Sequence, residues 1–168
     1  MIKKHISIIV AVAENNAIGK GNKLLCYIPD DLKRFKRLTT GHHVVMGKKT
    51  YESLPVKPLP NRTNVVISDI GGELIKGCEM AYSIEEAIEK CPDNKESFII
   101  GGGSIYSQFL PFAVKLYITK VHKAFDADTF FPEIDENEWK LIEREDVESD
   151  GNNDFSFSYL TYARKKTK

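Results

Sequence analysis

The chain has 168 residues with 24 basic and 24 acidic side chains, and its formal net charge at pH 7 is zero. A balanced charge creates no field that would recruit nucleic acid or a membrane surface, so both are excluded as expected partners. This length suits one compact domain over residues 1–168, which can fold without metal or disulfide staples, and we expect its partners to be small molecules.

Short apolar runs alternate along the chain with amphipathic segments, a pattern typical of a sheet covered by helices. The sequence predicts strands at 6–13, 43–46, 64–68, 97–100 and 116–122, interspersed with helices from Pro29, at 49–54, at 83–91 and from Ser104. Ser83 can cap the third helix, because Glu86 follows it at capping-box spacing.

The first predicted strand has a competing interpretation. It follows Lys3 and Lys4 and ends in Ala11-Val12-Ala13, which superficially resembles a secretory signal with an A-x-A cleavage site. The run is short, rich in β-branched residues and followed by a glycine turn, so a buried strand explains it more simply. No segment approaches the roughly 20 apolar residues that a bilayer span needs.

The C-terminal third changes character. Segments 139–147 and 155–163 flank the turn Asp150-Gly151-Asn152-Asn153, as the two strands of an antiparallel hairpin would. We therefore expect an α/β fold. Its central sheet should be mixed, mostly parallel and of about eight strands, with a C-terminal antiparallel hairpin and about four flanking helices.

Two adjacent carboxylates begin the first predicted helix. A step of about 100° per residue places Asp31 on the face of Phe35 and Leu38, whereas Asp30 shares its face with basic side chains. In one interpretation both acids only complement the helix N-terminus, which is worth about 0.3–1 kcal/mol. In the other, Asp31 lies at the mouth of an apolar pocket, where desolvation raises its pKa and lets it bind or protonate a cationic heterocycle.

Two turns between a strand and a helix can cradle phosphates. Residues 101–104 read Gly-Gly-Gly-Ser and residues 47–50 read Gly-Lys-Lys-Thr, so both offer bare backbone amides. The first is no Rossmann fingerprint, because Tyr106 replaces the third glycine, and the second lacks Walker A spacing. A tight structural turn and solvated lysines are the competing interpretations.

Metal and covalent chemistry are not indicated. The chain has three cysteines, Cys26, Cys78 and Cys91, which is an odd number, and none has C-x-x-C spacing. Neither a disulfide framework nor a zinc site is indicated, so a reducing cytosol fits best. The four histidines have no acidic neighbours at ligand spacing. No G-x-S-x-G elbow or thiol motif suggests a nucleophile. We expect no bound metal.

The order of these motifs closely resembles the dihydrofolate reductase family, and the likeness runs from Ile6 to about Tyr162. Its strongest pieces are Val10-Ala11, Ala17-Ile18-Gly19, Pro29-Asp30-Asp31-Leu32 with Phe35-Lys36, residues 45–53, residues 58–62, residues 100–106 and Asp128-Thr129-Phe130-Phe131-Pro132. The resemblance is to the bacterial chromosomal type. It implies reduction of 7,8-dihydrofolate to 5,6,7,8-tetrahydrofolate by NADPH for one-carbon metabolism, in a cytoplasmic monomer that antifolate inhibitors target.

The resemblance also implies roles for individual residues. Asp31, Leu24, Tyr106 and Thr119 would be catalytic, with Asp31 gripping the pterin and promoting its protonation and Thr119 accepting a hydrogen bond nearby. The substrate would be bound by Ile9, Val10, Ala11, Asp31, Leu32, Phe35, Lys36, Ser53, Leu54, Leu59, Arg62, Ile100, Tyr106 and Thr119. The cofactor would be bound by Ala11, Ile18, Gly19, Asn22, Leu24, Gly47, Lys48, Lys49, Thr50, Ile67, Ser68, Asp69, Ile100, Gly101, Gly102, Gly103, Ser104, Ile105 and Tyr106. Residues 14–24 would form a mobile lid.

Two departures from the family pattern bear on chemistry. Leu25-Cys26-Tyr27 replaces the usual Pro-Trp and a polar residue, and a thiol is a poor substitute for the indole N–H that fixes a water beside the acid. Asp69 adds a negative charge near the expected 2′-phosphate site, where it should weaken the preference for NADPH. Lys48 and Lys49 offset this charge, so we expect NADPH to remain preferred over NADH.

Two other functions remain open from the sequence. A pyrimidinone reductase of riboflavin synthesis shares this architecture, although Asp31 and Arg62 favour folate. A non-catalytic nucleotide-binding module would keep the glycine turn and lose the chemistry, and the altered Leu25-Cys26 pair is compatible with it.

Overall fold

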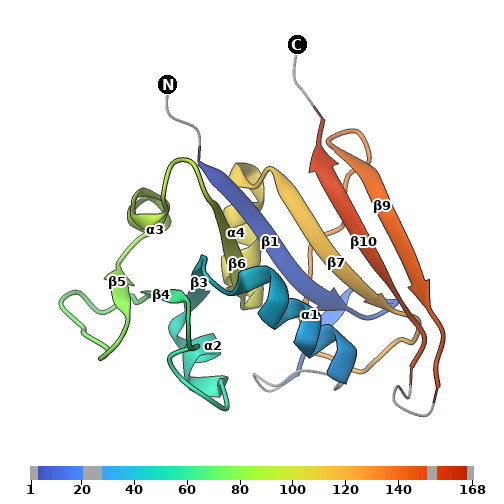
Figure 1. Cartoon of the computed structure of the whole chain (residues 1–168), viewed down its shortest axis with the longest axis horizontal. Helices are drawn as coiled ribbons and strands as arrows, with labels where there is room; N and C mark the ends of the chain where they lie inside the picture. Colours follow the sequence, from blue (N-terminus) through green and yellow to red (C-terminus); the bar gives the residue numbers. More distant parts are fainter. Residues whose placement is uncertain (1–3, 21–27, 151–154, 166–168) are drawn as a thin grey trace.

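A computed structural model describes residues 4–20, 28–150 and 155–165. Its main element is an eight-stranded sheet in the order β5-β4-β3-β6-β1-β7-β10-β9 (Figure 1). The strands are β1 (His5–Val12), β3 (His43–Gly47), β4 (Thr63–Ile67), β5 (Glu79–Ala81), β6 (Glu96–Gly101), β7 (Lys115–Val121), β9 (Trp139–Val147) and β10 (Phe157–Arg164). All pair in parallel except β10, which runs antiparallel to both β7 and β9.

The helices are short and connect these strands. They are α1 (Pro29–Thr39), α2 (Lys48–Ser53), α3 (Ile84–Lys90) and α4 (Gly103–Phe109), followed by the 3₁₀ helix η1 (Leu110–Phe112). A separate two-stranded sheet pairs β2 (Ala17–Gly19) with β8 (Thr129–Phe130). No helix in the described part of the chain is long and apolar enough to cross a membrane.

Strand β1 lies at the centre of the large sheet. It pairs in parallel with β6 on one side and with β7 on the other, and five consecutive residues from Ile6 to Val10 are buried. A strand covered on both faces reads as a continuous apolar run rather than an alternating one. The run that resembled a signal sequence is therefore the central strand of the described fold.

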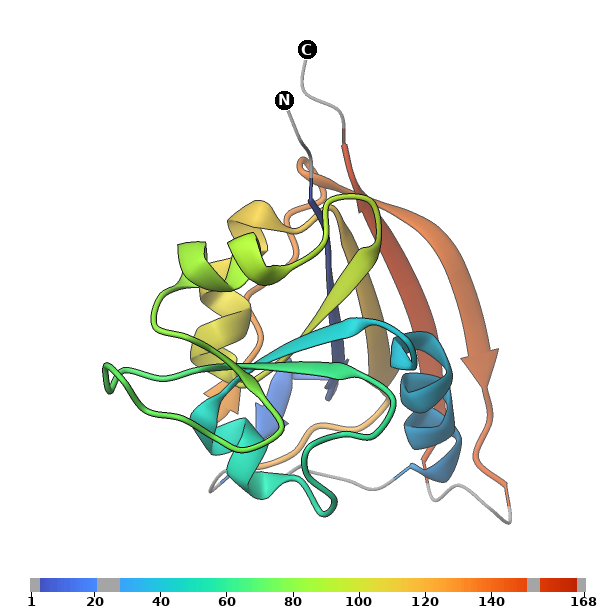
Figure 2. The ribbon, with the colours of Figure 1, turned by 60° about the vertical axis from the view of Figure 1, so that its left-hand side comes forward.

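Two layers of apolar side chains cover the two faces of the sheet. Ile8 and Val10 of β1 pack with residues of α3 and α4, whereas Ile9 points to the other face, where Phe35 of α1 and Tyr51 of α2 lie. Figure 2 shows α1 and the α3–α4 pair on opposite sides of the strands. Side chains alternate across a strand, so β1 contributes to both layers.

Helix α1 follows the rules for helix ends. It begins with Pro29 at a first-turn position, has Asp30 and Asp31 in its first turn, and has Lys36 and Arg37 in its last turn. Acids near the N-terminus and bases near the C-terminus both stabilise the helix dipole. These rules explain why α1 begins at Pro29, which puts Asp31 in its first turn.

The predicted α/β fold with its mixed sheet is confirmed, with three differences in detail. The sequence analysis missed β5 and the small β2–β8 sheet, which are too short to show a period. The last strand begins at Phe157 rather than at Phe155. Residues 151–153 of the predicted hairpin turn lie outside the described residues.

Candidate active site

A cleft of about 1510 Å³ opens where the parallel strands end. Its lining includes the last residues of four of them, which are Val12 of β1, Gly47 of β3, Ile67 of β4 and Val121 of β7. Ligands of open α/β sheets bind outside the carboxyl ends of the strands. The volume exceeds the roughly 300–1,000 Å³ of a pocket for one drug-sized ligand, so the cleft can hold two ligands together.

Asp31 enters this cleft from the first turn of α1. Its side chain is partly buried, and the Thr119 hydroxyl of β7 donates a hydrogen bond of 2.6 Å to its Oδ1. Burial raises the pKa of Asp31, whereas the Thr119 hydrogen bond and the nearby charge of Arg34 act in the opposite direction. The balance is a carboxyl group that holds its proton to a higher pH than a free aspartate does.

The hydrogen bond of Thr119 has the opposite sense to the one expected. The sequence analysis made Thr119 an acceptor, but in the structure its hydroxyl is the donor. An ionised carboxylate has only acceptor atoms, so a hydroxyl beside it must donate.

Apolar side chains line the same cleft as the Asp31 carboxylate. They come from three elements and the segments between them, and include Ile9, Ile28, Leu32, Phe35, Leu54, Leu59 and Ile100. Leu32 remains 39% exposed although it is apolar. A slot with apolar walls and the partly buried Asp31 carboxyl group suits a flat, cationic heterocycle.

Arg62 lies in the same cleft and is held in place by two hydrogen bonds. Its Nε donates to the Pro60 carbonyl oxygen at 2.9 Å, and its Nη1 donates to the Thr39 hydroxyl at 3.1 Å. Partial burial lowers its pKa, but the value stays far above neutrality for an arginine. The guanidinium is therefore a fixed cation suited to a carboxylate ligand.

The glycine turn after β6 brings bare backbone to the cleft. The peptide bond between Gly101 and Gly102 is cis, and Gly101 has φ +126°. A Cβ at Gly103 would lie 2.4 Å from Cγ2 of Thr129, and one at Gly102 would lie 3.3 Å from Oγ1 of Thr50. A side chain at Gly103 would clash and one at Gly102 would press on Thr50, so the turn carries bare backbone where α4 starts, a setting suited to an anion.

Tyr106 of α4 locks this turn to the central strand. Its hydroxyl donates a hydrogen bond of 2.9 Å to the Ile9 carbonyl oxygen, and burial raises the pKa of the phenol strongly. Its ring atoms lie 3.3 Å from the place a Cβ would take on Gly101. Gly101 alone, among the described residues proposed for the site, does not line the cleft.

A second cationic site lies where β3 runs into α2. Lys48 lines the cleft with Lys49 and Thr50, and Ser68 and Asp69 follow β4 beside them. The Lys48 ammonium makes an ion pair of 2.5 Å with Oε2 of Glu73, a residue that the sequence analysis did not single out. The other oxygen of Glu73 accepts a hydrogen bond from the Ser68 hydroxyl.

The structure brings the rest of the predicted site together. Every other described residue named above for substrate or cofactor lines this cleft, and so do Phe125, Thr129 and Tyr82, which the sequence analysis missed. Asn22, Leu24, Leu25, Cys26 and Tyr27 lie outside the described residues. Within the described part of the lid, the ammonium of Lys20 pairs with Asp126.

Comparisons with known proteins agree with this geometry. The family model for dihydrofolate reductase matches residues 5–164. A dihydrofolate reductase of Bacillus subtilis is 40% identical over 162 residues, which are 96% of this chain and 96% of that protein. One from Neisseria meningitidis serogroup A is 45% identical over 161 residues, covering 95% of this chain and 98% of the relative.

This chain belongs to the dihydrofolate reductase family.

A solved structure of a dihydrofolate reductase also has the same fold. The enzyme from Enterococcus faecalis, complexed with NADP(H) and RAB-propyl, superposes with a TM-score of 0.89 at 32% identity and covers 99% of this chain and 100% of its own. Among dihydrofolate reductases, this chain therefore differs in residues rather than in architecture.

The described residues fit the cofactor of dihydrofolate reductases. Gly102 leaves open the space above Thr50 that a Cβ would fill, and helices α2 and α4 both start at the cleft. Amides at helix starts together with the cations of Lys48 and Lys49 can hold the phosphates of a dinucleotide.

Proposed function

We propose that this chain reduces 7,8-dihydrofolate to 5,6,7,8-tetrahydrofolate with NADPH and so supplies one-carbon metabolism. The observation that carries the proposal is the partly buried Asp31 carboxyl, hydrogen-bonded to Thr119 inside an apolar slot that continues to the glycine turn. The family supports the reaction, and the E. faecalis relative is itself in complex with NADP(H).

In this proposal, Asp31 binds the amino-pyrimidine edge of the pterin. Burial raises its pKa, so the carboxyl group keeps its proton to a higher pH than a free aspartate does, and the apolar side chains of Ile9, Phe35 and Leu54 hold the ring flat. A carboxyl group sheltered from water favours a protonated heterocycle beside it. Asp31 therefore promotes protonation of the substrate, which the reduction requires in addition to a hydride.

Arg62 binds the α-carboxylate at the other end of the substrate. Its Nε and Nη1 are already anchored to Pro60 and Thr39, so the orientation of the guanidinium is fixed before the substrate arrives. A planar guanidinium can pair with a carboxylate through two parallel hydrogen bonds, which a lysine cannot.

NADPH supplies the hydride when it is bound. The amides from Gly102 to Ile105 and the side chains of Lys48, Lys49 and Thr50 hold its phosphates, while Ala11, Ile18 and Gly19 line the nicotinamide and ribose. The protein contributes position and electrostatics, by keeping two ligands in contact on an apolar floor from which water is excluded.

The proposal extends to the setting of the enzyme. We place it in the cytoplasm as a monomer that binds dihydrofolate and antifolate inhibitors, and neither nucleic acid nor a membrane. The zero net charge supports the absence of nucleic acid and of a membrane surface among its partners. Size-exclusion chromatography with light scattering checks the monomer, and a stable dimer would contradict it.

The test follows NADPH oxidation by absorbance with dihydrofolate as the second substrate. Asp31→Asn should lose most hydride transfer at neutral pH and recover part of it in acid, where solvent can protonate the substrate. The matched control is Asp30→Asn, which removes the exposed neighbouring carboxylate and should stay within about twofold of the parent.

Two outcomes would contradict the proposal. No NADPH oxidation by the parent chain would reject the reaction, and turnover of a ribosylamino-pyrimidinone instead would favour the riboflavin pathway. Equal rates for Asp31→Asn and the parent across the pH range would reject the role of Asp31.

A further inference from the structure

The Glu73 carboxylate binds two groups that line the cleft and are suited to a phosphate. Its Oε2 lies 2.5 Å from the Lys48 ammonium, and its Oε1 accepts the Ser68 hydroxyl hydrogen bond. Lys48 and Ser68 line the cleft, whereas Glu73 does not, so the carboxylate reaches them from outside the cleft. The side chain of Glu73 is only 20% exposed.

The loop that carries Glu73 is fixed by its own hydrogen bonds. The Tyr82 hydroxyl donates to the Glu73 carbonyl oxygen at 2.6 Å, and the Glu73 amide donates to the Ile70 carbonyl oxygen at 3.2 Å. The Ile70 amide in turn donates to the Ser68 hydroxyl at 3.0 Å. The position of Glu73 therefore follows from the loop, and does not depend on its ion pair alone.

An ammonium and a hydroxyl at the end of a strand are the groups that bind a phosphate monoester. A carboxylate that already binds both the ammonium and the hydroxyl competes with the phosphate for them. The exposed carboxylate of Asp69 adds a second negative charge that acts on Lys48. An incoming phosphate must therefore displace one acid from Lys48 and approach another.

We propose that Glu73 competes with the 2′-phosphate of NADPH for Lys48 and Ser68 and thereby reduces the discrimination between NADPH and NADH. The inference rests on the proposed function, because that function brings the adenosine end of the cofactor to these residues. NADH carries a neutral 2′-hydroxyl and does not need to displace Glu73, so the competition acts on NADPH alone.

The charges of this pair persist across the neutral pH range. The hydrogen bond with Lys48 lowers the pKa of Glu73, and the same contact raises the pKa of Lys48. Neither group is neutralised near pH 7, so the competition operates under ordinary assay conditions.

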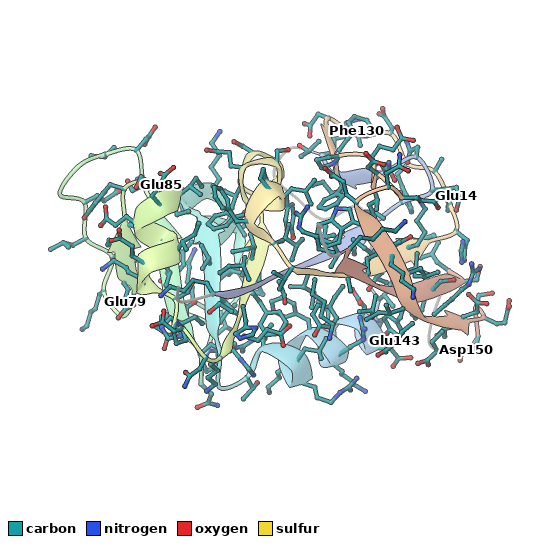
Figure 3. All side chains as sticks on the ribbon, turned by 90° about the horizontal axis from the view of Figure 1, so that it is seen from above. Glu14, Glu79, Glu85, Phe130, Glu143 and Asp150 are labelled. Atoms are coloured by element: carbon teal, nitrogen blue, oxygen red, sulfur yellow. The ribbon has the colours of Figure 1, made fainter. Side chains whose placement is uncertain are left out.

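The first test replaces the acid by its neutral isostere. Glu73→Gln keeps the shape and can still accept the Ser68 hydrogen bond, but it removes the charge that holds Lys48. We expect the KM for NADPH to fall about tenfold and that for NADH to change less than about twofold. The control is Glu85→Gln on α3, an exposed glutamate labelled in Figure 3, which changes the net charge equally.

The second test measures binding without turnover. Adenosine 2′,5′-bisphosphate and adenosine 5′-monophosphate differ in the 2′-phosphate, and calorimetric titration gives the affinity of each. Glu73→Gln should tighten the bisphosphate about tenfold and leave the monophosphate unchanged. Lys48→Ala should weaken the bisphosphate selectively. When Lys48 is already replaced by Ala, Glu73→Gln should raise the affinity for the bisphosphate less than about twofold, because the lysine for which the two anions compete is absent.

These measurements separate the two proposals. Unchanged affinity in Glu73→Gln, or equal changes for both fragments, would overturn the role of Glu73. An equal gain with and without Lys48 would also overturn it, since it would mean that the charge acts at long range. If the parent chain does not reduce dihydrofolate, the proposed function fails even where the fragment titrations behave as expected.

Discussion

Thr119 tunes the acid on which the proposed chemistry depends. Its hydrogen bond to Oδ1 of Asp31 stabilises the ionised carboxylate, while burial in the cleft destabilises it. The two effects oppose one another, and burial is the larger because the pKa of Asp31 is raised. Asp31 on helix α1 is therefore an acid whose strength is adjusted by a neighbour on strand β7.

Removing the Thr119 hydroxyl should move the pH dependence of hydride transfer to higher pH. Thr119→Val keeps the shape but loses the donor, so the pKa of Asp31 rises further and its proton is kept to a higher pH. The alkaline limb of the single-turnover rate should move in the same direction. Thr161→Val, a buried threonine of β10, is the control. A shift towards acid, or no shift, would mean that Thr119 does not set the ionisation of Asp31.

The sequence could distinguish Asp31 from Asp30 because both lie on one helix, where a fixed angular step decides which acid faces apolar neighbours. Thr119 was correctly predicted to lie near Asp31, but the direction of its hydrogen bond depends on which group carries the proton. Glu73 escaped the sequence analysis because its contact with Lys48 joins residues from separate elements, and no spacing rule connects them. Cys26 stays a prediction, since residues 21–27 lie outside the described part.

At the level of elements, the glycine turn and β8 fit tightly against one another. Gly103 begins α4, and Thr129 of the small β2–β8 sheet lies directly where a Cβ at Gly103 would be. The choice of residue in the turn is therefore restricted by a neighbouring strand as well as by the conformation of its own backbone. This contact links the glycine turn after β6 to β8, a strand too short to be predicted from the sequence.

A side chain at Gly103 should destabilise the fold. Gly103→Ala places a Cβ 2.4 Å from Cγ2 of Thr129, so α4 or β8 must shift, and overpacking of this kind costs roughly 1–3 kcal/mol. Denaturant unfolding measures the loss. Gly71→Ala is the control, because no atom lies within 4 Å of its Cβ position. Adding Thr129→Ser removes the clashing methyl and should restore stability; a double variant as unstable as Gly103→Ala would contradict the steric explanation.

Strand length decided which elements the sequence could predict. β1, β3, β4, β6, β7 and β9 are five or more residues long and carry apolar runs or lie in an evident hairpin, so their positions were found to within one or two residues. β2, β5 and β8 have two or three residues, which is shorter than any period can reveal. Their pairing is decided by contacts with distant segments.

At the scale of the whole molecule, the cleft connects both halves of the sheet. Its lining runs from Ile67 and Ser68 on the β4 side to Thr119 and Val121 on the β7 side. A ligand that fills the cleft therefore contacts elements from most of the chain, and its binding energy adds to the stability of the folded state as a whole.

Saturation with NADPH should consequently raise the melting temperature. At a concentration of 100 Kd, binding to the folded state alone adds about 2.7 kcal/mol. For a chain of this size that corresponds to roughly 5–10 °C. Differential scanning calorimetry measures the shift, and adenosine 5′-monophosphate at the same concentration, which fills only part of the cleft, should give a smaller one. An unchanged melting temperature at saturating NADPH would contradict the fit of the cofactor.

The central place of β1 has a consequence for biosynthesis. This strand leaves the ribosome before both of its pairing partners, which begin only at Glu96 and Lys115. Until those segments emerge, a nascent chain presents an apolar strand with two open edges, which is the kind of segment that self-associates. Incorporation of β1 into the sheet must therefore wait for the later half of the chain, and chaperones that shield extended apolar peptides have most to protect in this strand.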